Sequence, residues 1–324
     1  MPMKSKDLKN LLSTFCCNIS NRGRLRLTGQ DRVRFLNGQV TNDIKSLATG
    51  KGCYAALTNA KGKMRGDAVI LNTSDGLLLD VEPGNDARIA SELEKFIIAD
   101  DVQIENITST WHAYTLVGDQ VAEVLKISGL CTLPPKDLFE ISSFTNNNFG
   151  KVFLFRSHRA QNDSFDLWVE QTYSVSLAQT LIKAVEQIGG SMLDASILEI
   201  PRVEAGILRF GVEMDENTLP PEAGIETIAI SYTKGCYVGQ EVISRIKSVG
   251  HVNRMLVRLR LPESAERGML LQFAGKEIGK LGSAISSPRF GRIGLAIIRH
   301  EAAKLGTHLT LPKGEAVVVE DFKL

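Results

Sequence analysis

One short segment of the chain concentrates the residue types that could do chemistry. Residues 231–246 have the sequence SYTKGCYVGQEVISRI, in which Cys236 provides the only thiol. The thiolate is the reactive form of cysteine, and a neighbouring cation lowers its pKa from an unperturbed value of about 8.5. Lys234 and Arg245 are the candidate cations. We therefore predict that Cys236 is a reactive thiol and that these two residues are its electrostatic partners.

The residues around this cysteine form a dense motif, Lys-Gly-Cys-Tyr-Val-Gly-Gln-Glu. Its two glycines can adopt backbone angles that other residues avoid, so the loop between them can turn tightly and hold the thiol outward. The alternative is that Cys236 is a small buried hydrophobe, as most free cysteines are. Besides the cysteine and its lysine, the motif residues that we single out are Gly235, Tyr237, Gly239, Gln240 and Glu241.

A carboxylate at the start of an apolar run is the second candidate. Residues 59–63 form a predicted turn that leads into a strand, and Asp67 stands where that strand becomes apolar. A carboxylate in such a place needs a partner, because burying an unpaired charge is costly. It either serves a ligand or accepts hydrogen bonds from the local backbone, as turn aspartates do. Both interpretations stay open on these residues alone.

The Cys236 motif resembles that of the YgfZ branch of the YgfZ/GcvT family, whose members include the glycine-cleavage aminomethyltransferase and a mitochondrial iron–sulfur assembly factor. The resemblance extends from about Leu27 to the C-terminus. It implies a protein that binds tetrahydrofolate, or a one-carbon derivative of it, and supports the assembly or repair of iron–sulfur clusters. Through cluster enzymes, such a protein would support tRNA modification. The implied partners are folate and iron–sulfur cluster proteins or assembly factors.

The resemblance also implies roles for particular residues. In the family, the glutamate of an Arg-x-Glu-x-Gly segment is expected to bind the folate head-group, which corresponds here to Glu204, with Arg202 in the same segment. A carboxylate suits this role, because its two oxygens match two parallel donors of a pterin ring. The alternative is an exposed glutamate paired with Arg202, which contributes little. Asp67 corresponds to the catalytic aspartate of the aminomethyltransferases and would lie near the folate nitrogens.

Two departures from the aminomethyltransferases argue against aminomethyl transfer as the main function. Residues 157–163 have the sequence SHRAQND where those enzymes carry a Tyr-Thr-Gly-Glu-type segment, and the enzymes lack the Cys236 motif. We therefore expect a folate-binding factor rather than a stand-alone enzyme. A folate-dependent aminomethyl or one-carbon transferase, with Asp67 as base or counter-charge, is the first alternative. The second is a tRNA- or protein-binding scaffold without folate, which would use basic residues such as Lys247, Arg254, Arg258 and Arg260.

Composition is that of a soluble globular protein. Of the 324 residues, 43% are hydrophobic and 23% charged, and the length predicts two or three domains. The net charge of +1 gives no long-range field for a polyanion, so direct nucleic-acid binding is not favoured, although it stays open. The five cysteines include no Cys-x-x-Cys pair, which indicates a reducing compartment. We expect a cytoplasmic protein with no membrane segment and no metal site.

Hydrophobic periodicity predicts two α+β units followed by a barrel. The first unit has a split βαβ order, with helices at 31–47, broken near Gly38, and at 86–98, and strands at 24–28, 53–58, 64–71, 77–82 and 102–107. The second has helices at 119–127 and 176–188 and strands at 111–117, 151–156 and 165–170. Leu8, Leu11, Leu12 and Phe15 recur at helical spacing and predict a further helix before the first unit.

The last part of the chain differs in character. Six short β-rich runs predict a small antiparallel barrel, and they lie at 251–261, 270–273, 276–285, 292–298, 308–311 and 315–322. The expected fold class is therefore α+β, with two split-βαβ (ferredoxin-like) halves that form a GcvT-like folate-binding body. We place that body at 1–249, with halves of about 1–108 and 109–249 that could be interwoven, and the barrel at 250–324.

Overall fold

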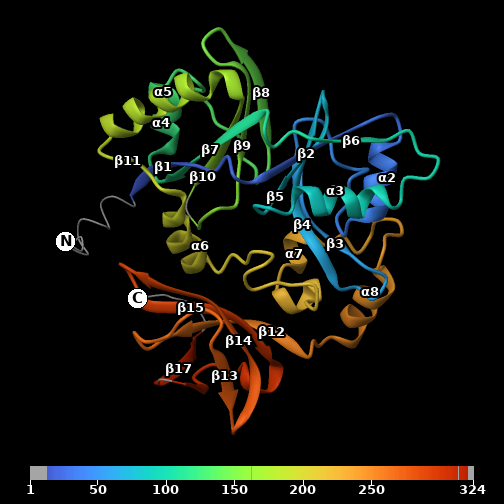
Figure 1. Cartoon of the computed structure of the whole chain (residues 1–324), viewed down its shortest axis with the longest axis vertical. Coiled ribbons are helices and arrows are strands. Elements are labelled where there is room, and N and C mark those ends of the chain that lie inside the picture. The colour runs from blue at the N-terminus through green and yellow to red at the C-terminus, as the bar shows by residue number, and fades with distance from the viewer. Residues whose placement is uncertain (1–12, 162, 313, 320–324) are drawn as a thin grey trace.

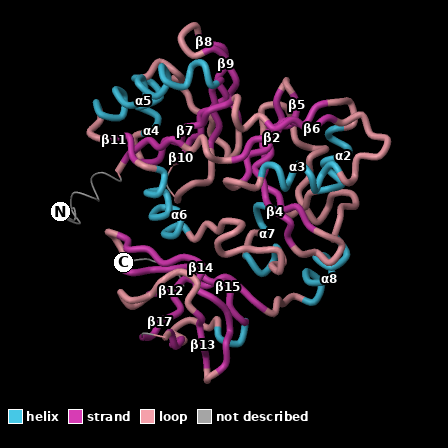
Figure 2. The backbone as a smooth tube through the Cα atoms, viewed as in Figure 1, coloured by secondary structure: helices cyan, strands magenta, loops and turns pink. Residues whose placement is uncertain are grey.

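Figure 1 shows the computed structural model, in which two β-sheets with their helices and a C-terminal barrel are arranged around a common centre. The structure describes residues 13–161, 163–312 and 314–319. Strands form most of the regular backbone, and the helices are short (Figure 2). Within these residues, no helix combines the length and the apolarity that crossing a bilayer requires.

The N-terminal part of the chain forms a five-stranded sheet in the order β3-β4-β5-β2-β6. Its strands are β2 (Gly23–Thr28), β3 (Gly52–Thr58), β4 (Met64–Thr73), β5 (Gly76–Val81) and β6 (Gln103–Asn106). Helices α2 (Arg32–Gln39) and α3 (Asp86–Glu94) pack on one face through Phe35, Leu36, Ile89 and Leu93. Side chains alternate between the two faces of a strand, so the sheet face opposite α2 and α3 can pack against another part of the fold.

A six-stranded sheet has the order β11-β1-β7-β10-β9-β8. Its strands are β1 (Thr14–Asn18), β7 (Trp111–Gly118), β8 (Ile141–Asn146), β9 (Gly150–Arg156), β10 (Ser164–Glu170) and β11 (Ser191–Leu193). Helices α4 (Val121–Ile127) and α5 (Ser174–Gln187) cover its outer face. On the inner face Phe15, Phe153 and Trp168 pack with Val69 and Leu71 of the five-stranded sheet, so the two sheets share one apolar core.

Two short helices and a linker connect the sheets to the barrel. Helix α6 (Glu199–Ala205) lies between the six-stranded sheet and the barrel, and α7 (Glu226–Ala229) lies near the centre (Figure 1). Helix α8 (Gln240–Val249) then leads into the barrel, and Gly250 ends it with a φ of 81°. That left-handed conformation favours glycine. We therefore propose the boundary of the C-terminal domain at this residue.

The C-terminal part of the chain is a closed barrel in the order β12-β15-β14-β13-β16-β17. Its strands are β12 (Arg254–Arg260), β13 (Leu270–Phe273), β14 (Lys276–Ser287), β15 (Gly291–Arg299), β16 (His308–Leu311) and β17 (Gly314–Val319). Alternate residues such as Leu259, Leu271 and Leu309 fill the interior. Each of the six predicted runs contributes one strand, so the predicted barrel and the α+β class are confirmed.

Several local predictions are wrong. The helix predicted at 31–47 ends at Gln39, next to the predicted break near Gly38, and does not resume, because the β-branched Val40 is extended and pairs with Leu57 of β3. The helix predicted at 86–98 ends at Glu94, and Phe96 beyond that end is 46% exposed. Phe15 lies in β1 and not in a helix, while Leu8, Leu11 and Leu12 lie outside the described residues. The strands β1, β8 and β11 were not predicted.

Candidate functional site

A cavity of about 920 Å³ lies where the two sheets and the barrel meet. Its walls come from β4 and β5, from α6, from the segment 206–209 and from β12 of the barrel. Helix α6 ends at Gly206, whose φ of 74° turns the chain back so that the next three residues line the cavity. The lining combines apolar side chains with many charged ones, which is the composition of a ligand site.

Asp67 is held in the wall of this cavity by the register of β3 and β4. Ala56 is its register partner, and Tyr54 stands two residues along β3, so Tyr54 and Asp67 are diagonal neighbours on one face. The Tyr54 hydroxyl donates to Oδ2 of Asp67 at 2.6 Å. Asp67 is only 6% exposed. Burial raises the pKa of Asp67 to about 6, and the charge of Glu82 adds to this effect while the hydrogen bond from Tyr54 opposes it.

The other acidic groups of this wall are joined to arginines. Nε of Arg22 lies 2.9 Å from Oδ1 of Asp80, and its Nη1 lies 2.6 Å from Oε1 of Glu82. Nε of Arg209 lies 2.6 Å from Oε2 of Glu82, and its Nη1 lies 2.8 Å from Oε1 of Glu199. Burial alone would raise the pKa of Glu82, but Arg22 and Arg209 outweigh it and lower this pKa to about 2. These carboxylates are therefore ionised.

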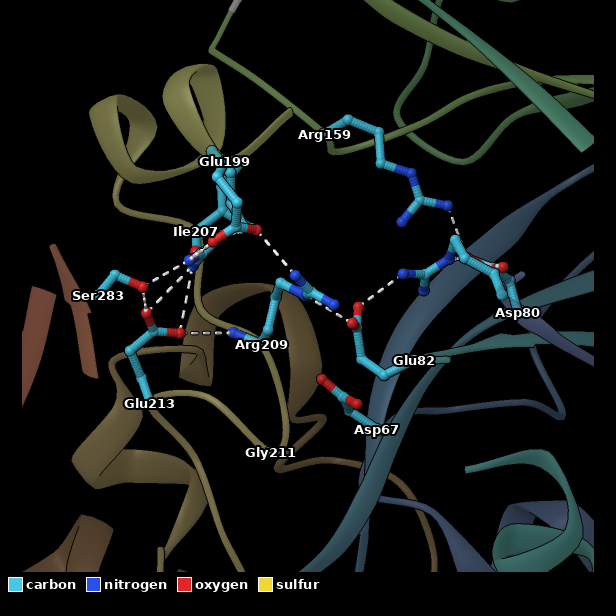
Figure 3. A network of polar contacts seen from close by, with 12 residues as sticks. Asp67, Asp80, Glu82, Arg159, Glu199, Ile207, Arg209, Gly211, Glu213 and Ser283 are labelled. Carbon is cyan, nitrogen blue, oxygen red and sulfur yellow. Dashed lines mark hydrogen bonds and ion pairs between the residues drawn. The ribbon is translucent and has the colours of Figure 1, made fainter. Parts of the chain in front are cut away.

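The network continues to both neighbouring parts of the fold. Nη2 of Arg159 lies 2.7 Å from Asp80 and 2.5 Å from Asp166 of the six-stranded sheet. Nη2 of Arg202 on α6 lies 2.6 Å from Glu199, and it donates to Ser283 of the barrel at 2.6 Å. Figure 3 shows this continuous network across the three parts. It fixes the walls of the cavity relative to one another.

Asp67 stands apart from this network. In Figure 3 it lies beside Glu82 and Arg209, but no guanidinium among the described residues pairs with it. Asp80, Glu82 and Glu199 each contact two arginines, and Glu222 pairs with Arg254 at 2.8 Å. Among the described residues, Asp67 is thus a buried carboxylate of the cavity wall that forms no ion pair. A ligand that brings hydrogen-bond donors or positive charge would supply the missing partner.

Arg202 and Glu204, from the same predicted segment, have different surroundings in the structure. Arg202 lines the cavity, but Glu204 does not belong to its lining. Glu204 instead accepts a hydrogen bond from the Ser287 hydroxyl, and its Oε2 lies 3.6 Å from Nη1 of Arg289 in the barrel. Burial raises the pKa of Glu204, and these two contacts oppose the shift. The predicted pterin contact at Glu204 stays a prediction, whereas Arg202 supports the cavity wall through Glu199 and Glu213.

The Cys236 loop lies outside the cavity lining, and its thiol is exposed as predicted. Lys234 is buried, and its ammonium donates to the carbonyls of Asn37, Val40 and Asn42 at 2.5, 2.7 and 2.7 Å. Burial lowers the pKa of Lys234 to about 8, and Asp43 opposes the shift. The three contacts use every proton of the ammonium, so Lys234 anchors the loop to the C-terminal end of α2.

The remaining motif residues serve the packing of this loop or face solvent. Tyr237 is 7% exposed, with its ring 5.0 Å from the Lys234 ammonium. Gly239 has a φ of 86°, and a Cβ there would lie 2.5 Å from the Asn59 carbonyl oxygen, so a side chain cannot fit. The loop thereby packs on the turn before β4. The outward-facing members are Gly235, Glu241 and Arg245, and Gln240 begins α8.

The exposure of Cys236 leads to a test by alkylation. We expect iodoacetamide to modify Cys236 before the other four cysteines of the folded protein. Cys16 and Cys17 are buried, and burial raises the pKa of Cys53 to about 12, which disfavours its thiolate. Mass spectrometry of peptides over time measures the order. The fast phase should vanish in Cys236→Ser, and modification of Cys131 at the same rate as Cys236 would contradict the prediction.

Sequence reasoning missed most of the residues that build the cavity wall. Tyr54, Arg22, Arg159 and Arg209 were not singled out, although Arg159 lies in the segment 157–163 that we noted as a departure. A signal was present in β5, where Asp80 interrupts an otherwise apolar strand. A charge in a buried strand needs an opposite charge nearby. Nothing in the sequence, however, says which arginine supplies it.

The fold and the cavity define a three-part α+β protein with a central ligand site. Residues 13–234 match the family model described as GCVT N-terminal domain, so the chain belongs to that family. The chain is 28% identical over 316 residues to an aminomethyltransferase of Thermotoga maritima, a match that covers 94% of this chain and 84% of the relative. It is 26% identical over 306 residues to the putative chloroplastic transferase At1g60990 of Arabidopsis thaliana, covering 94% and 69%.

The fold is that of a solved aminomethyltransferase structure. The glycine cleavage system aminomethyltransferase T from Bartonella henselae superposes with a TM-score of 0.85 at 21% identity, covering 99% of this chain and 90% of that one. The predicted GcvT-like fold is therefore confirmed. The Thermotoga maritima relative supports the aminomethyltransferase alternative better than iron–sulfur assembly or tRNA modification, which none of the three matches names. The assignment to the YgfZ branch stays a prediction.

Proposed function

We propose that this protein binds a reduced folate in the central cavity and takes part in the transfer of a one-carbon unit. The observation that carries the proposal is Asp67, a buried carboxylate in the cavity wall that accepts a hydrogen bond from Tyr54 and forms no ion pair within the described part of the chain. The relatives named as aminomethyltransferases support the same class of reaction.

The cavity fits a ligand of this kind. Its volume of about 920 Å³ lies within the range of about 300–1,000 Å³ that is usual for small-molecule sites. Apolar lining residues such as Val69, Leu208 and Met255 can pack on flat rings, while Asp67 can accept hydrogen bonds from ring or amine N–H groups. A bound reduced folate would supply a nucleophilic nitrogen that accepts or releases a one-carbon unit.

The role that the chain itself would take falls to Asp67. Because its pKa is about 6, the Asp67 carboxylate is ionised at neutral pH. This pKa is also close enough to pH 7 for the group to take up and release a proton. Its carboxylate can accept a proton from the reacting nitrogen or stabilise positive charge that develops there. Tyr54 positions the carboxylate by donating to Oδ2, which leaves Oδ1 for the ligand.

A titration of the full chain with tetrahydrofolate under reducing conditions tests the proposal. We expect heat of binding in the wild type and weaker binding in Asp67→Asn, because the amide loses the charge-assisted hydrogen bond. Glu204→Gln, run alongside, decides whether that residue contacts the pterin. Glu241→Gln, an exposed change on α8, is the matched control and should bind as the wild type does. No heat and no competition up to millimolar ligand would overturn folate binding.

A second candidate function rests on the thiol loop. Cys236 is exposed, its loop is held by the buried Lys234, and neither residue lines the folate cavity. One-carbon transfer gives this loop no role, whereas support of iron–sulfur cluster assembly would give it one. The test is the activity of an iron–sulfur enzyme in cells that lack the protein, restored by wild type but not by Cys236→Ser. Equal restoration by both would remove this candidate.

A further inference from the structure

A second hollow, of about 680 Å³, lies where the barrel meets the linker 217–222 and the turn before β4. We call it the barrel groove, and define it by its basic residues Lys63, His251, Arg254, Arg299 and His300. It shares Glu222 and Val252 with the central cavity, whereas its basic residues are a different set from those of that cavity. The barrel groove is therefore a separate candidate site with its own charges.

Two arginines of the barrel groove are neighbours on adjacent strands. Arg254, the first residue of β12, is the register partner of Arg299, the last residue of β15. Directly opposite side chains point to the same face of a sheet, and like charges in that arrangement repel each other. Nη2 of Arg254 lies 2.8 Å from Oε2 of Glu222. Arg299 is exposed, and its guanidinium has no ion pair within the residues that the structure describes.

A third cation reaches the same place from the turn before β4. Nη2 of Arg254 donates to the Asn217 carbonyl at 3.0 Å, and Nζ of Lys63 donates to Oδ1 of Asn217 at 3.5 Å. One residue of the linker thus contacts both a guanidinium and an ammonium. Among the described parts of the chain, no carboxylate pairs with Lys63. Three cations from three separate elements therefore converge on one groove, and two of them have no counter-ion.

The sum of the charges leaves the barrel groove positive. Lys63, Arg254 and Arg299 carry three positive charges, and Glu222 and Glu301 carry two negative ones, which gives +1 with both histidines neutral. Glu222 is buried against Arg254, whereas Glu301 is exposed at the rim and forms no ion pair in the described chain. An anion would therefore be attracted to the side of the groove where Lys63 and Arg299 lie.

The donors of the barrel groove suit phosphate groups. Arginine binds phosphate oxygens in pairs, and lysine binds them as a point charge. Neutral donors add to these cations, from two imidazoles and two amides, and they belong to His251, His300, Asn217 and Asn253. This set exceeds what the two oxygens of one carboxylate can accept. The volume of about 680 Å³ also lies within the range of about 300–1,000 Å³ that is usual for small-molecule sites.

The lining favours a compact ligand over a nucleic-acid strand. Apolar contacts come from Leu219 and Val252, and the described lining includes no aromatic ring on which a base could stack. We infer that the barrel groove binds a compact polyphosphate, such as the di- or triphosphate group of a small molecule, through Arg299 and Lys63. The ligand would place negative charge beside the opposed arginines and would link the barrel to the turn before β4. This inference does not depend on the proposed folate function.

A calorimetric titration of the full chain with inorganic tripolyphosphate, in a buffer free of phosphate, tests the inference. We expect wild type to bind it and the double variant Lys63→Gln/Arg299→Gln to lose about a hundredfold in affinity, since each charge-assisted contact contributes about tenfold or more. The control is Lys61→Gln/Arg260→Gln, which removes the same charge from exposed positions outside the groove. It should bind as wild type does.

Glu301→Gln provides a variant with the opposite expected effect. It removes the negative charge at the rim of the barrel groove, so it should bind tripolyphosphate several-fold more tightly than wild type. A misfolded protein would not gain affinity, so this variant tests the inference even if the double variant does not fold. An affinity that fell or stayed the same in Glu301→Gln would contradict the inference.

Two further outcomes would overturn the inference. The first is a wild type that gives no heat with tripolyphosphate up to millimolar concentration, or that loses equal affinity in the groove variant and in the control. The second is an RNA duplex that binds more tightly than tripolyphosphate and loses this affinity in Lys63→Gln/Arg299→Gln. That result would assign the barrel groove to a nucleic-acid backbone instead of a compact ligand.

Discussion

Replacing Asp67 with asparagine is expected to slow one-carbon transfer by about a hundredfold or more, within the range of about 10²–10⁴ that a positioned acid or base contributes. Asparagine keeps the shape and can still accept the hydrogen bond from Tyr54, but it cannot take up a proton or offset a positive charge. The measurement is the rate at which tetrahydrofolate is converted to its methylene derivative in the presence of an aminomethyl donor. The wild-type rate should rise with pH through about 6, the pKa of Asp67.

The same substitution should stabilise the folded protein at neutral pH. The folded-state pKa of Asp67 is about 6, above the unfolded value of about 3.9, so the folded state binds more protons between these values. Stability contributed by this group therefore falls as pH rises from about 4 to 6. Above that range the ionised carboxylate lowers the free energy of unfolding by up to about 3 kcal/mol, and Asp67→Asn removes this loss. Urea unfolding at pH 7.5 and at pH 4 should show a gain that disappears in acid.

Asp75 provides the matched control for both measurements. It lies in the turn before β5, and a hydrogen bond from Lys151 lowers its pKa. Asp75→Asn should therefore give no gain in stability at neutral pH and no loss of transfer rate. If Asp67→Asn kept the wild-type transfer rate, Asp67 would have no role in the reaction. A variant that is less stable than wild type at pH 7.5 would show that its charge is compensated in the folded state.

Replacing Asp80 with asparagine should destabilise the fold by about 3–5 kcal/mol, the usual cost of breaking a buried ion pair from one side. Asp80 is 1% exposed and lies between Arg22 and Arg159, at 2.9 and 2.7 Å. Burial alone would raise the pKa of Asp80, but these two cations lower it below its usual range. Removing the charge takes away the carboxylate that the two guanidinium groups share, and leaves Arg22 with Glu82 alone and Arg159 with Asp166 alone. The free energy of unfolding in urea measures the loss.

Asp137→Asn is the control for this prediction. Asp137 pairs with Lys51 at 2.8 Å, but its side chain is 73% exposed, and exposed pairs contribute at most about 1 kcal/mol. The stabilisation from Asp80 is present above the unfolded pKa of about 3.9 and is lost as pH falls through the lower folded value. Equal losses in Asp80→Asn and Asp137→Asn would mean that the buried network does not hold the sheets together.

Local features of the sequence determined much of the architecture. The alternation of apolar residues predicted the strands of the barrel, including β13 and β16 with their observed ends, because one side of each strand must be buried. The two glycines of the thiol motif predicted that Cys236 is exposed, and the structure confirms this. Asp67 was singled out because a carboxylate in an apolar strand needs a partner. Each of these inferences depends on residues that are close together in the chain.

Tertiary structure alone decided how the charges are paired. Arg209 contacts Glu82 across 127 positions of sequence, and Arg159 contacts Asp80 across 79. Arg258, considered in the sequence as a nucleic-acid contact, lines the cavity, while Glu204 faces the barrel. The partner of a buried charge depends on which elements pack against its own, and packing is a property of the whole chain. Sequence therefore indicated that Asp67 needs a partner, and the fold determined that no arginine supplies it.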